Sequence, residues 1–163
     1  MRRTCLGFAI FALAAIRPAL ADDIPGKLAP PQGAVLIGAY KATGVQVYVC
    51  TAQGSALQPV LKAPDAQLME NGKVVARHYA GPTWEASDGS KVVGKLLESV
   101  RPPRDSDISW LLLTAESTGQ GLLAGTRFVQ RIETSGGAAP ATGCITAGTE
   151  LRVPYSATYR FFR

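Results

Sequence analysis

Short segments that alternate between apolar and polar residues run through most of this 163-residue chain, and they constrain the fold more than any other feature. Residues 45–50 and 126–134 repeat with period two, which is typical of strands with one buried face. No segment shows the period of an amphipathic helix over any length, and the gaps between the predicted strands are too short for the helical crossovers of a parallel sheet. The pattern predicts an all-β fold, a single antiparallel sandwich or barrel of about nine or ten short strands, and it leaves the choice between sandwich and barrel open.

Turn residues indicate which predicted strands pair. Asn71-Gly72 accepts positive φ at both central positions of a type I′ turn, so residues 67–70 and 73–79 are predicted to form a hairpin. Residues 57–61 form a further predicted strand before it. Asp88-Gly89-Ser90 provides a second turn between two short strands.

The N-terminus carries the three regions of a secretory signal peptide in the required order. Arg2 and Arg3 precede an apolar run at residues 5–16, and Ala19-Leu20-Ala21 supplies the small residues of a cleavage site, so cleavage is expected after Ala21. The run has about a dozen residues where a bilayer-spanning helix needs about 20, so no stable membrane anchor is expected. The mature protein is therefore predicted to be soluble and periplasmic or extracellular.

After the signal peptide, the chain divides into a leader and a domain. Residues 22–32 contain Pro25, Pro30 and Pro31 with little periodic pattern, so we expect an extended, Pro-rich leader on the surface or against a sheet edge. Residues 33–163 are expected to form a single β domain, because the mature chain is long enough for one hydrophobic core and too short for two.

Removal of the signal peptide also changes the expected charge. Three of the 17 Lys and Arg residues and none of the 12 Asp and Glu residues lie within residues 1–21, which leaves 14 basic against 12 acidic residues and a net charge of +2. The remaining basic residues are scattered among carboxylates, as on any solvated surface. Nucleic acid is therefore not an expected partner.

The same removal leaves two cysteines, because Cys5 lies within the signal peptide. Cys50 and Cys144 are predicted to form a disulfide in an oxidising compartment. The bridge would close a loop of roughly 95 residues, which the chain-entropy account relates to at most about 4.7 kcal/mol of stability. A redox-active pair is the alternative, but the chain lacks the C-x-x-C spacing typical of one.

The densest polar cluster, residues 78–90, supplies the candidate catalytic residues. Its His78 is the only histidine of the chain and would act as a general base. Glu85 or Asp88 would orient the imidazole, and Ser90 or a water molecule would be the nucleophile. The alternative is structural, with Asp88 and Ser90 satisfying turn amides and His78 hydrogen-bonded within a strand.

Aromatic and basic residues supply the candidate ligand-binding positions. Tyr79 and Trp84, if exposed, would stack on a sugar or another flat ligand. Arg131, followed by a polar, Gly-rich turn at residues 135–137, would receive an anion. Core packing of the aromatic residues and a solvated outer face around Arg131 explain the same pattern.

The sequence offers little for a metal or a cofactor. One histidine, two cysteines expected to pair and dispersed carboxylates give no set of metal ligands at a working spacing. Residues 119–124 (GQGLLA) match a variant of the dinucleotide fingerprint, but the alternating residues from Thr126 onward predict a return strand where that site needs a helix. We therefore expect no metal, no cofactor and a Gly-rich hairpin connection at residues 119–124.

Several unusually composed strings are spread along nearly the whole mature chain: residues 47–50 (VYVC), 63–66 (APDA), 78–85 (HYAGPTWE), 88–90 (DGS), 109–113 (SWLLL), 130–137 (QRIETSGG) and 153–159 (VPYSATY). Through these strings the chain resembles a secreted microbial family catalogued as domain of unknown function 3455. The resemblance implies no activity. It implies that a shared site, where one exists, lies in the 78–90 cluster and the 131–137 stretch.

These observations give two hypotheses for the function. The first is a binding or structural module, with a small-molecule or carbohydrate-like ligand near His78, Trp84 and Asp88. The alternative is a secreted hydrolase that uses His78 as general base. Turnover of ester, glycoside or phosphate substrates, with His78→Ala as control, distinguishes the two. A structure shows whether His78, Trp84 and Asp88 converge on a pocket or point separately into the core and the solvent.

Overall fold

The computed structural model describes residues 24–163, which form strands joined by turns and one short 3₁₀ turn. The predicted signal peptide, residues 1–21, lies outside the described residues. No helix in the described part of the chain is long and apolar enough to cross a membrane. In chain order the elements are η1 (Gly26–Leu28), β1 (Leu36–Gln53), β2 (Ala56–Glu70), β3 (Lys73–Tyr79), β4 (Thr83–Ala86), β5 (Lys91–Val100), β6 (Trp110–Thr118), β7 (Phe128–Gly136) and β8 (Glu150–Phe162).

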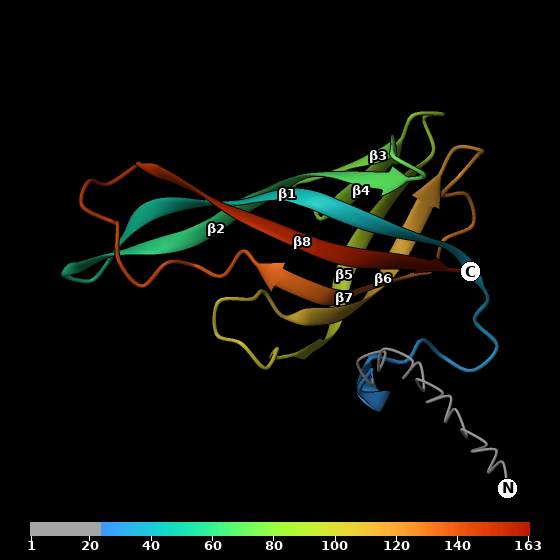
Figure 1. The fold of residues 1–163 in the computed structure, drawn as a ribbon, viewed down its shortest axis with the longest axis horizontal. Helices are drawn as coiled ribbons and strands as arrows, with labels where there is room; N and C mark the ends of the chain where they lie inside the picture. The colour runs from blue at the N-terminus through green and yellow to red at the C-terminus, as the bar shows by residue number, and fades with distance from the viewer. Residues whose placement is uncertain (1–23) are drawn as a thin grey trace, which may run out of the picture.

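The strands form one closed antiparallel barrel. Each strand pairs with the next one in the chain, and β8 pairs with β1 (Figure 1). This confirms the all-β prediction and selects the barrel over the sandwich. The barrel has eight strands, fewer than the roughly nine or ten expected, because residues 57–61 and 67–70 belong to the single strand β2, which has a bulge opposite Val47 and Tyr48.

The hairpin predicted at Asn71-Gly72 is confirmed. Glu70 pairs with Lys73, and the two residues between them have φ angles of 50° and 77°. These values lie in the left-handed region that a type I′ turn requires, and Asn and Gly adopt it most readily. The local sequence therefore sets the register between β2 and β3.

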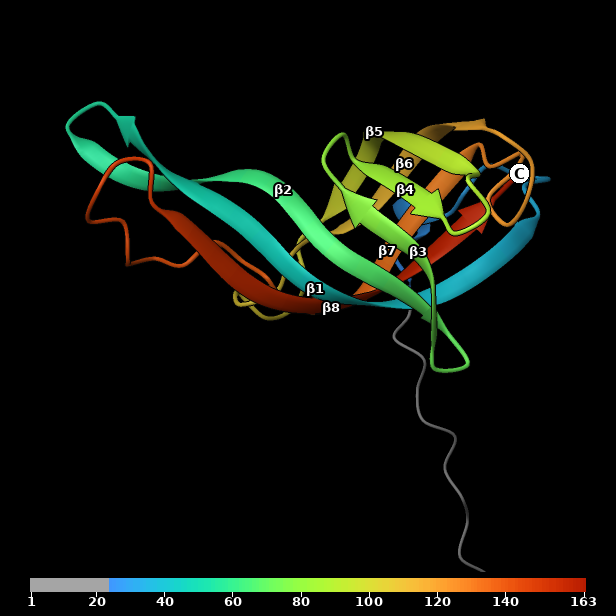
Figure 2. The ribbon, with the colours of Figure 1, turned by 90° about the horizontal axis from the view of Figure 1, so that it is seen from above.

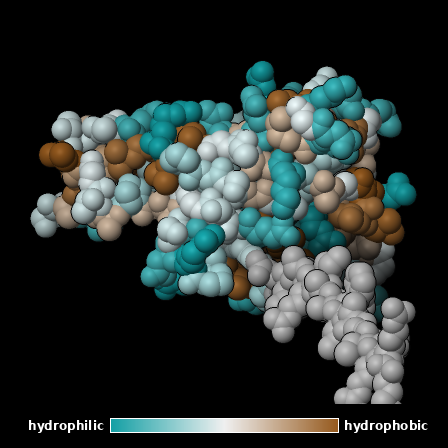
Figure 3. All heavy atoms as spheres, in the orientation of Figure 1, coloured by the Kyte–Doolittle hydropathy of each residue, from teal (hydrophilic) through white to brown (hydrophobic). Residues whose placement is uncertain are grey.

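Three strands, β1, β2 and β8, continue beyond the barrel as an arm (Figure 2). Because β3 pairs only with residues 66–70 of β2, residues 56–65 form a free edge of this arm. Pro59 and Pro64 lack a backbone N–H group and Lys62 adds a charge, so the edge is a poor template for another strand. Hydrophobic side chains are scattered along the arm among more polar ones (Figure 3).

The predicted disulfide is present. Cys50, near the end of β1, is bonded to Cys144 in the connection between β7 and β8, and their Cα atoms are 5.3 Å apart. The bond therefore ties this connection to the arm. Backbone hydrogen bonds add to it, because the amide of Cys50 donates to Thr149 and its carbonyl accepts from Gly148.

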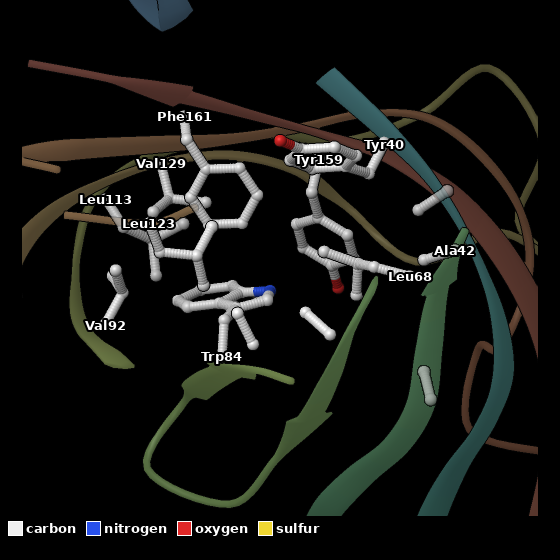
Figure 4. Packing of buried hydrophobic residues seen from close by; sticks show 14 of the residues in the cluster. Tyr40, Ala42, Leu68, Trp84, Val92, Leu113, Leu123, Val129, Tyr159 and Phe161 are labelled. Carbon is white, nitrogen blue, oxygen red and sulfur yellow. The ribbon is translucent and has the colours of Figure 1, made fainter. Parts of the chain in front are cut away.

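Aromatic side chains fill most of the barrel interior. The rings of Tyr159 and Phe161 contact Trp84 edge to face, with centroid distances of 5.4 and 5.9 Å (Figure 4). On another side of Trp84 lies the ring of His78, stacked at 4.5 Å and nearly parallel. A Cβ at Gly94 would lie 3.0 Å from the indole, so a glycine here allows Trp84 to pack closely against β5.

The leader covers part of the outer surface of the barrel. Leu28 of η1 is fully buried against Trp110, Leu112 and Ile132 on the outer face of β6 and β7. The Gln130 amide donates a hydrogen bond of 2.7 Å to the Leu28 carbonyl. The leader therefore lies against the outer face of the sheet and not at a sheet edge, and it holds a 3₁₀ turn and a buried anchor within the segment expected to be extended.

We predict that Leu28→Ala destabilises the protein by about 2–5 kcal/mol, because it removes a fully buried side chain and leaves a cavity. The matched control is Leu96→Ala, since Leu96 is 58% exposed and its truncation is expected to cost about 0.5 kcal/mol or less. Urea unfolding of both variants measures the difference. Equal effects would mean that the leader does not contribute to the folded barrel.

The disulfide is predicted to stabilise the protein by up to about 4.7 kcal/mol, because it closes a loop between residues 94 positions apart. Urea unfolding of the double variant Cys50→Ala/Cys144→Ala measures this loss. A reductant should lower the unfolding midpoint of the natural protein and leave that of the variant unchanged. The prediction would be contradicted if the natural protein had the same unfolding midpoint as the variant and a reductant did not lower it.

Candidate functional site

A cavity of about 300 Å³ opens where the arm leaves the barrel. It is bounded by β1, β2, β3, β6, β7 and the turn between β3 and β4. The residues that line it are Gln46, Leu61, Lys62, Ala63, Pro64, His78, Ala80, Gly81, Pro82, Leu111 and Arg131. Two residues proposed from the sequence, His78 and Arg131, thus meet at one cavity.

Arg131 points toward the barrel interior. It pairs directly with Tyr159, a core residue, and cross-strand partners place their side chains on the same face of a sheet. Burial raises the pKa of Tyr48 and of Tyr155, and the positive charge of Arg131 opposes that rise. The guanidinium Nε donates to the Ser109 carbonyl at 3.0 Å. Among residues 24–163, none of the ion pairs includes Arg131.

Gln46 lines the same cavity from β1. Gln46 is only 2% exposed, and its side-chain amide nitrogen has no hydrogen-bond partner among the described residues. Gly137 packs against it, since a Cβ there would lie 3.2 Å from Cγ of Gln46 and 2.8 Å from Cβ of Tyr155. Gly137 also has a φ of 84°, which favours glycine. The position of Gln46 therefore depends on the Gly-rich end of β7.

His78 is buried and neutral. Its Nδ1 lies 2.9 Å from the Thr83 carbonyl oxygen, which only accepts, so Nδ1 carries the proton and Nε2 is left as an acceptor. Burial lowers the pKa of His78 to about 3; the hydrogen bond to Thr83 opposes this, and the charge of Arg131 adds to it. At neutral pH the imidazole therefore carries no charge.

Glu85 lies on the opposite side of the sheet from His78. In the β3–β4 pair His78 faces Trp84, whereas Glu85 faces Arg77, and neighbouring positions on a strand point to opposite faces. Outside the barrel the Tyr79 hydroxyl donates to Glu85 at 2.6 Å, and Lys91 lies 3.4 Å from the same carboxylate. The structure therefore does not bring Glu85 to His78, and it places Tyr79 on the outer surface.

Asp88 and Ser90 serve a turn. Asp88 accepts hydrogen bonds from the Ser90 amide at 2.9 Å, the Ser90 hydroxyl at 2.6 Å and the Leu122 amide at 2.7 Å. Ser90 Oγ in turn accepts from the Leu123 amide at 3.1 Å. The hydrogen bond from the Ser90 hydroxyl is the largest cause that lowers the pKa of Asp88. The two side chains thus fasten the β4–β5 turn to the connection between β6 and β7, which includes residues 119–124.

The candidate catalytic residues therefore do not converge. The turn that holds Asp88 and Ser90 follows Ala86, at the opposite end of β4 from the β3–β4 turn beside His78. Trp84 is 1% exposed and lies behind His78 in the core, so its face is not available to a ligand. Of the candidate residues, His78 and Arg131 line the cavity.

The sequence patterns did not identify Gln46, although they contain a signal for it. Gln46 alternates in phase with Tyr48 and Cys50, both buried, so it is a polar residue on the inward face of a strand. Such a residue needs a hydrogen-bond partner.

No group of three or more His, Cys, Asp or Glu residues arranged to hold a metal ion occurs within the described residues.

We predict that His78 stays neutral in the folded protein down to about pH 4.5, since its pKa is lowered to about 3. Its ring-proton resonance, the only one from a histidine in the chain, should not titrate between pH 8 and that limit. In urea-unfolded protein it should titrate near about 6.5. A midpoint near that value in the folded protein would contradict the prediction.

The same difference should make stability depend on pH. Below about 6.5 the unfolded chain takes up a proton that the folded protein excludes, so the free energy of unfolding falls as the pH drops, by at most about 1.4 kcal/mol per unit. This loss continues down to the folded pKa of about 3. His78→Gln should flatten the slope between pH 6.5 and 5, where most carboxylates remain ionised. An unchanged slope in that variant would assign the effect to other groups.

Comparison with known proteins identifies a family without assigning an activity. The family model described as "Protein of unknown function (DUF3455)" matches residues 30–163, which is nearly all of the described chain. Neither a curated protein nor a solved structure gives a significant match. The match includes every residue that lines the cavity. The chain therefore belongs to the family described as Protein of unknown function (DUF3455).

Proposed function

We propose that this protein is a binding domain that holds a small molecule through an anionic group at the mouth of its barrel. The observation that carries the proposal is Arg131, whose guanidinium is turned toward the barrel interior with no carboxylate paired to it among the described residues. A partly buried charge without a partner is costly, and a bound anion would remove that cost.

The polar groups of the cavity suit an anion. Arg131 has Nε fixed by Ser109, which orients the rest of its planar donor group. Gln46 adds an amide nitrogen that has no other partner among the described residues. Guanidinium and amide donors together match the acceptor oxygens of a carboxylate or phosphate. Barrel mouths are common ligand sites, and about 300 Å³ is at the small end of the range for such cavities.

Binding is better supported than hydrolysis. The pKa of His78, about 3, makes its imidazole a weak base near neutral pH. The described residues that line the cavity include no serine, threonine or cysteine, so a hydrolase here would need water as its nucleophile. A carbohydrate-like ligand has less support than an anion, because Trp84 is buried behind His78.

We also propose that the protein works in the periplasm or outside the cell. The disulfide between Cys50 and Cys144 supports this, because such bonds persist mainly in oxidising compartments. The signal-peptide pattern at residues 1–21 gives independent support from the sequence.

Titration calorimetry with small carboxylates, phosphate and sulfate tests this proposal. Arg131→Gln should lower the affinity for the best-bound anion by roughly 10-fold or more, since hydrogen bonds to charged groups contribute about 1.5–3 kcal/mol. The matched control is Arg77→Gln, which removes the same charge from an exposed position on the outer face of β3 and should change the affinity little.

Two outcomes would contradict the proposed function. Equal losses in Arg131→Gln and Arg77→Gln would mean that the anions respond to overall charge and not to the cavity. Turnover of ester, glycoside or phosphate substrates that is abolished by His78→Ala would favour the hydrolase alternative instead.

A further inference from the structure

The less buried residues that line this cavity are mostly apolar. The apolar ones, here called the rim, are Leu61, Ala63, Pro64, Ala80, Pro82 and Leu111, and the charged side chains of Lys62 and Arg131 lie among them. Leu61 is 53% exposed although it is a large aliphatic residue. A ligand that reaches Gln46 and His78 would pass these side chains.

Burial defines the inner end of the cavity. Gln46 and His78 are 2% and 3% exposed, so these two polar side chains lie deepest among the lining residues. A ligand that satisfies both ends of the cavity must therefore present a polar group inward and an apolar body outward.

Among the described residues that line the cavity, Arg131 is the basic side chain without a carboxylate partner. The other basic residue of the cavity, Lys62, is paired with Glu150 at 2.5 Å on the arm. Arg131 has no such partner within the described part of the chain. A ligand with a single anionic group therefore fits better than one with an anion at each end.

We propose that the ligand is an aliphatic monocarboxylate of short to medium chain length, bound with its carboxylate toward Arg131 and Gln46. Its chain lies along Leu61, Leu111 and Pro82 at the rim. This inference rests on the proposed function, to which it adds the chemical class of the ligand. The alternative occupants, small polar anions and neutral apolar molecules, are distinguished by the test.

The experiment measures the affinity of the folded protein for butyrate, hexanoate, octanoate and the neutral 1-octanol, each below its aggregation limit. Each added methylene that reaches the rim should tighten binding by up to roughly 4-fold. Octanoate should bind more tightly than 1-octanol, and Arg131→Gln should remove that preference. Octanoate should also shift the resonance of His78, the only histidine of the chain, because its carboxylate arrives beside this ring.

Two exposed leucines provide a matched pair of variants. Leu61, at 53% exposure, lines the cavity, whereas Leu97, at 49% exposure, lies on β5 away from it. Leu61→Thr should lower the affinity for octanoate several-fold and leave the affinity for butyrate unchanged. Leu97→Thr should change neither affinity. Both positions are exposed, so neither change should unfold the barrel.

The outcomes separate this inference from the proposed function. Affinity that depends on Arg131 but not on chain length would overturn the aliphatic ligand and leave the anion site standing. Equal losses in the two leucine variants would overturn the inference by showing adsorption to exposed apolar surface. Binding of phosphate or sulfate but of no carboxylate would overturn the inference alone. Both proposals would be overturned if none of the anions bound, or if octanoate and 1-octanol bound equally and Arg131→Gln changed no anion affinity.

Discussion

The pairing of β1 with β8 is the interaction on which the rest of the structure depends. It runs from Leu36 opposite Phe162 to Val49 opposite Glu150, so it joins the two ends of the domain along most of both strands. Without it the sheet would be open, with two long unpaired edges. Closure also creates an interior, which brings the Tyr159 and Phe161 rings of β8 onto Trp84 of β4. Aromatic and aliphatic side chains pack together in that interior, and the cavity lined by His78 and Arg131 lies where the arm leaves the barrel.

The same closure decides which residues meet at the cavity. Arg131 faces inward because β7 pairs with β8 in a register that sets it opposite Tyr159. His78 faces inward because β3 pairs with β4 so that it lies opposite Trp84. Gln46 comes from β1 and reaches the cavity beside Gly137, which follows β7 directly. Strands far apart in the sequence thus contribute one polar side chain each, and the arm and the β3–β4 turn add the apolar rim.

Local chemistry accounts for what could be predicted from the sequence. The type I′ turn at Asn71-Gly72, the turn hydrogen bonds of Asp88 and Ser90, and the single partner available to Cys50 each depend on residues whose identity restricts their conformation or bonding. The choice of barrel over sandwich and the set of cavity residues depend on long-range pairing, which period-two patterns do not specify. The 78–90 cluster illustrates the limit. Its residues are neighbours in sequence, but alternation and a strand end separate His78 from Glu85, Asp88 and Ser90.

Several buried polar side chains elsewhere in the described part of the barrel have hydrogen-bond partners. The Gln130 amide donates to the Leu28 carbonyl, and the Thr134 and Thr126 hydroxyls donate to the carbonyls of Ile108 and Leu123, all at 2.7 Å. Among the described residues, the buried side-chain polar atoms without a partner are the Gln46 amide nitrogen at the cavity and the Trp84 indole nitrogen within the core. An unpaired buried donor costs about 1–3 kcal/mol, so a fold that satisfies its other donors retains these two at the expense of stability. Local departures from good packing and bonding are expected at functional sites. The unpartnered amide of Gln46 and the guanidinium of Arg131, which line the same cavity, form such a departure, and the proposed anion site depends on them.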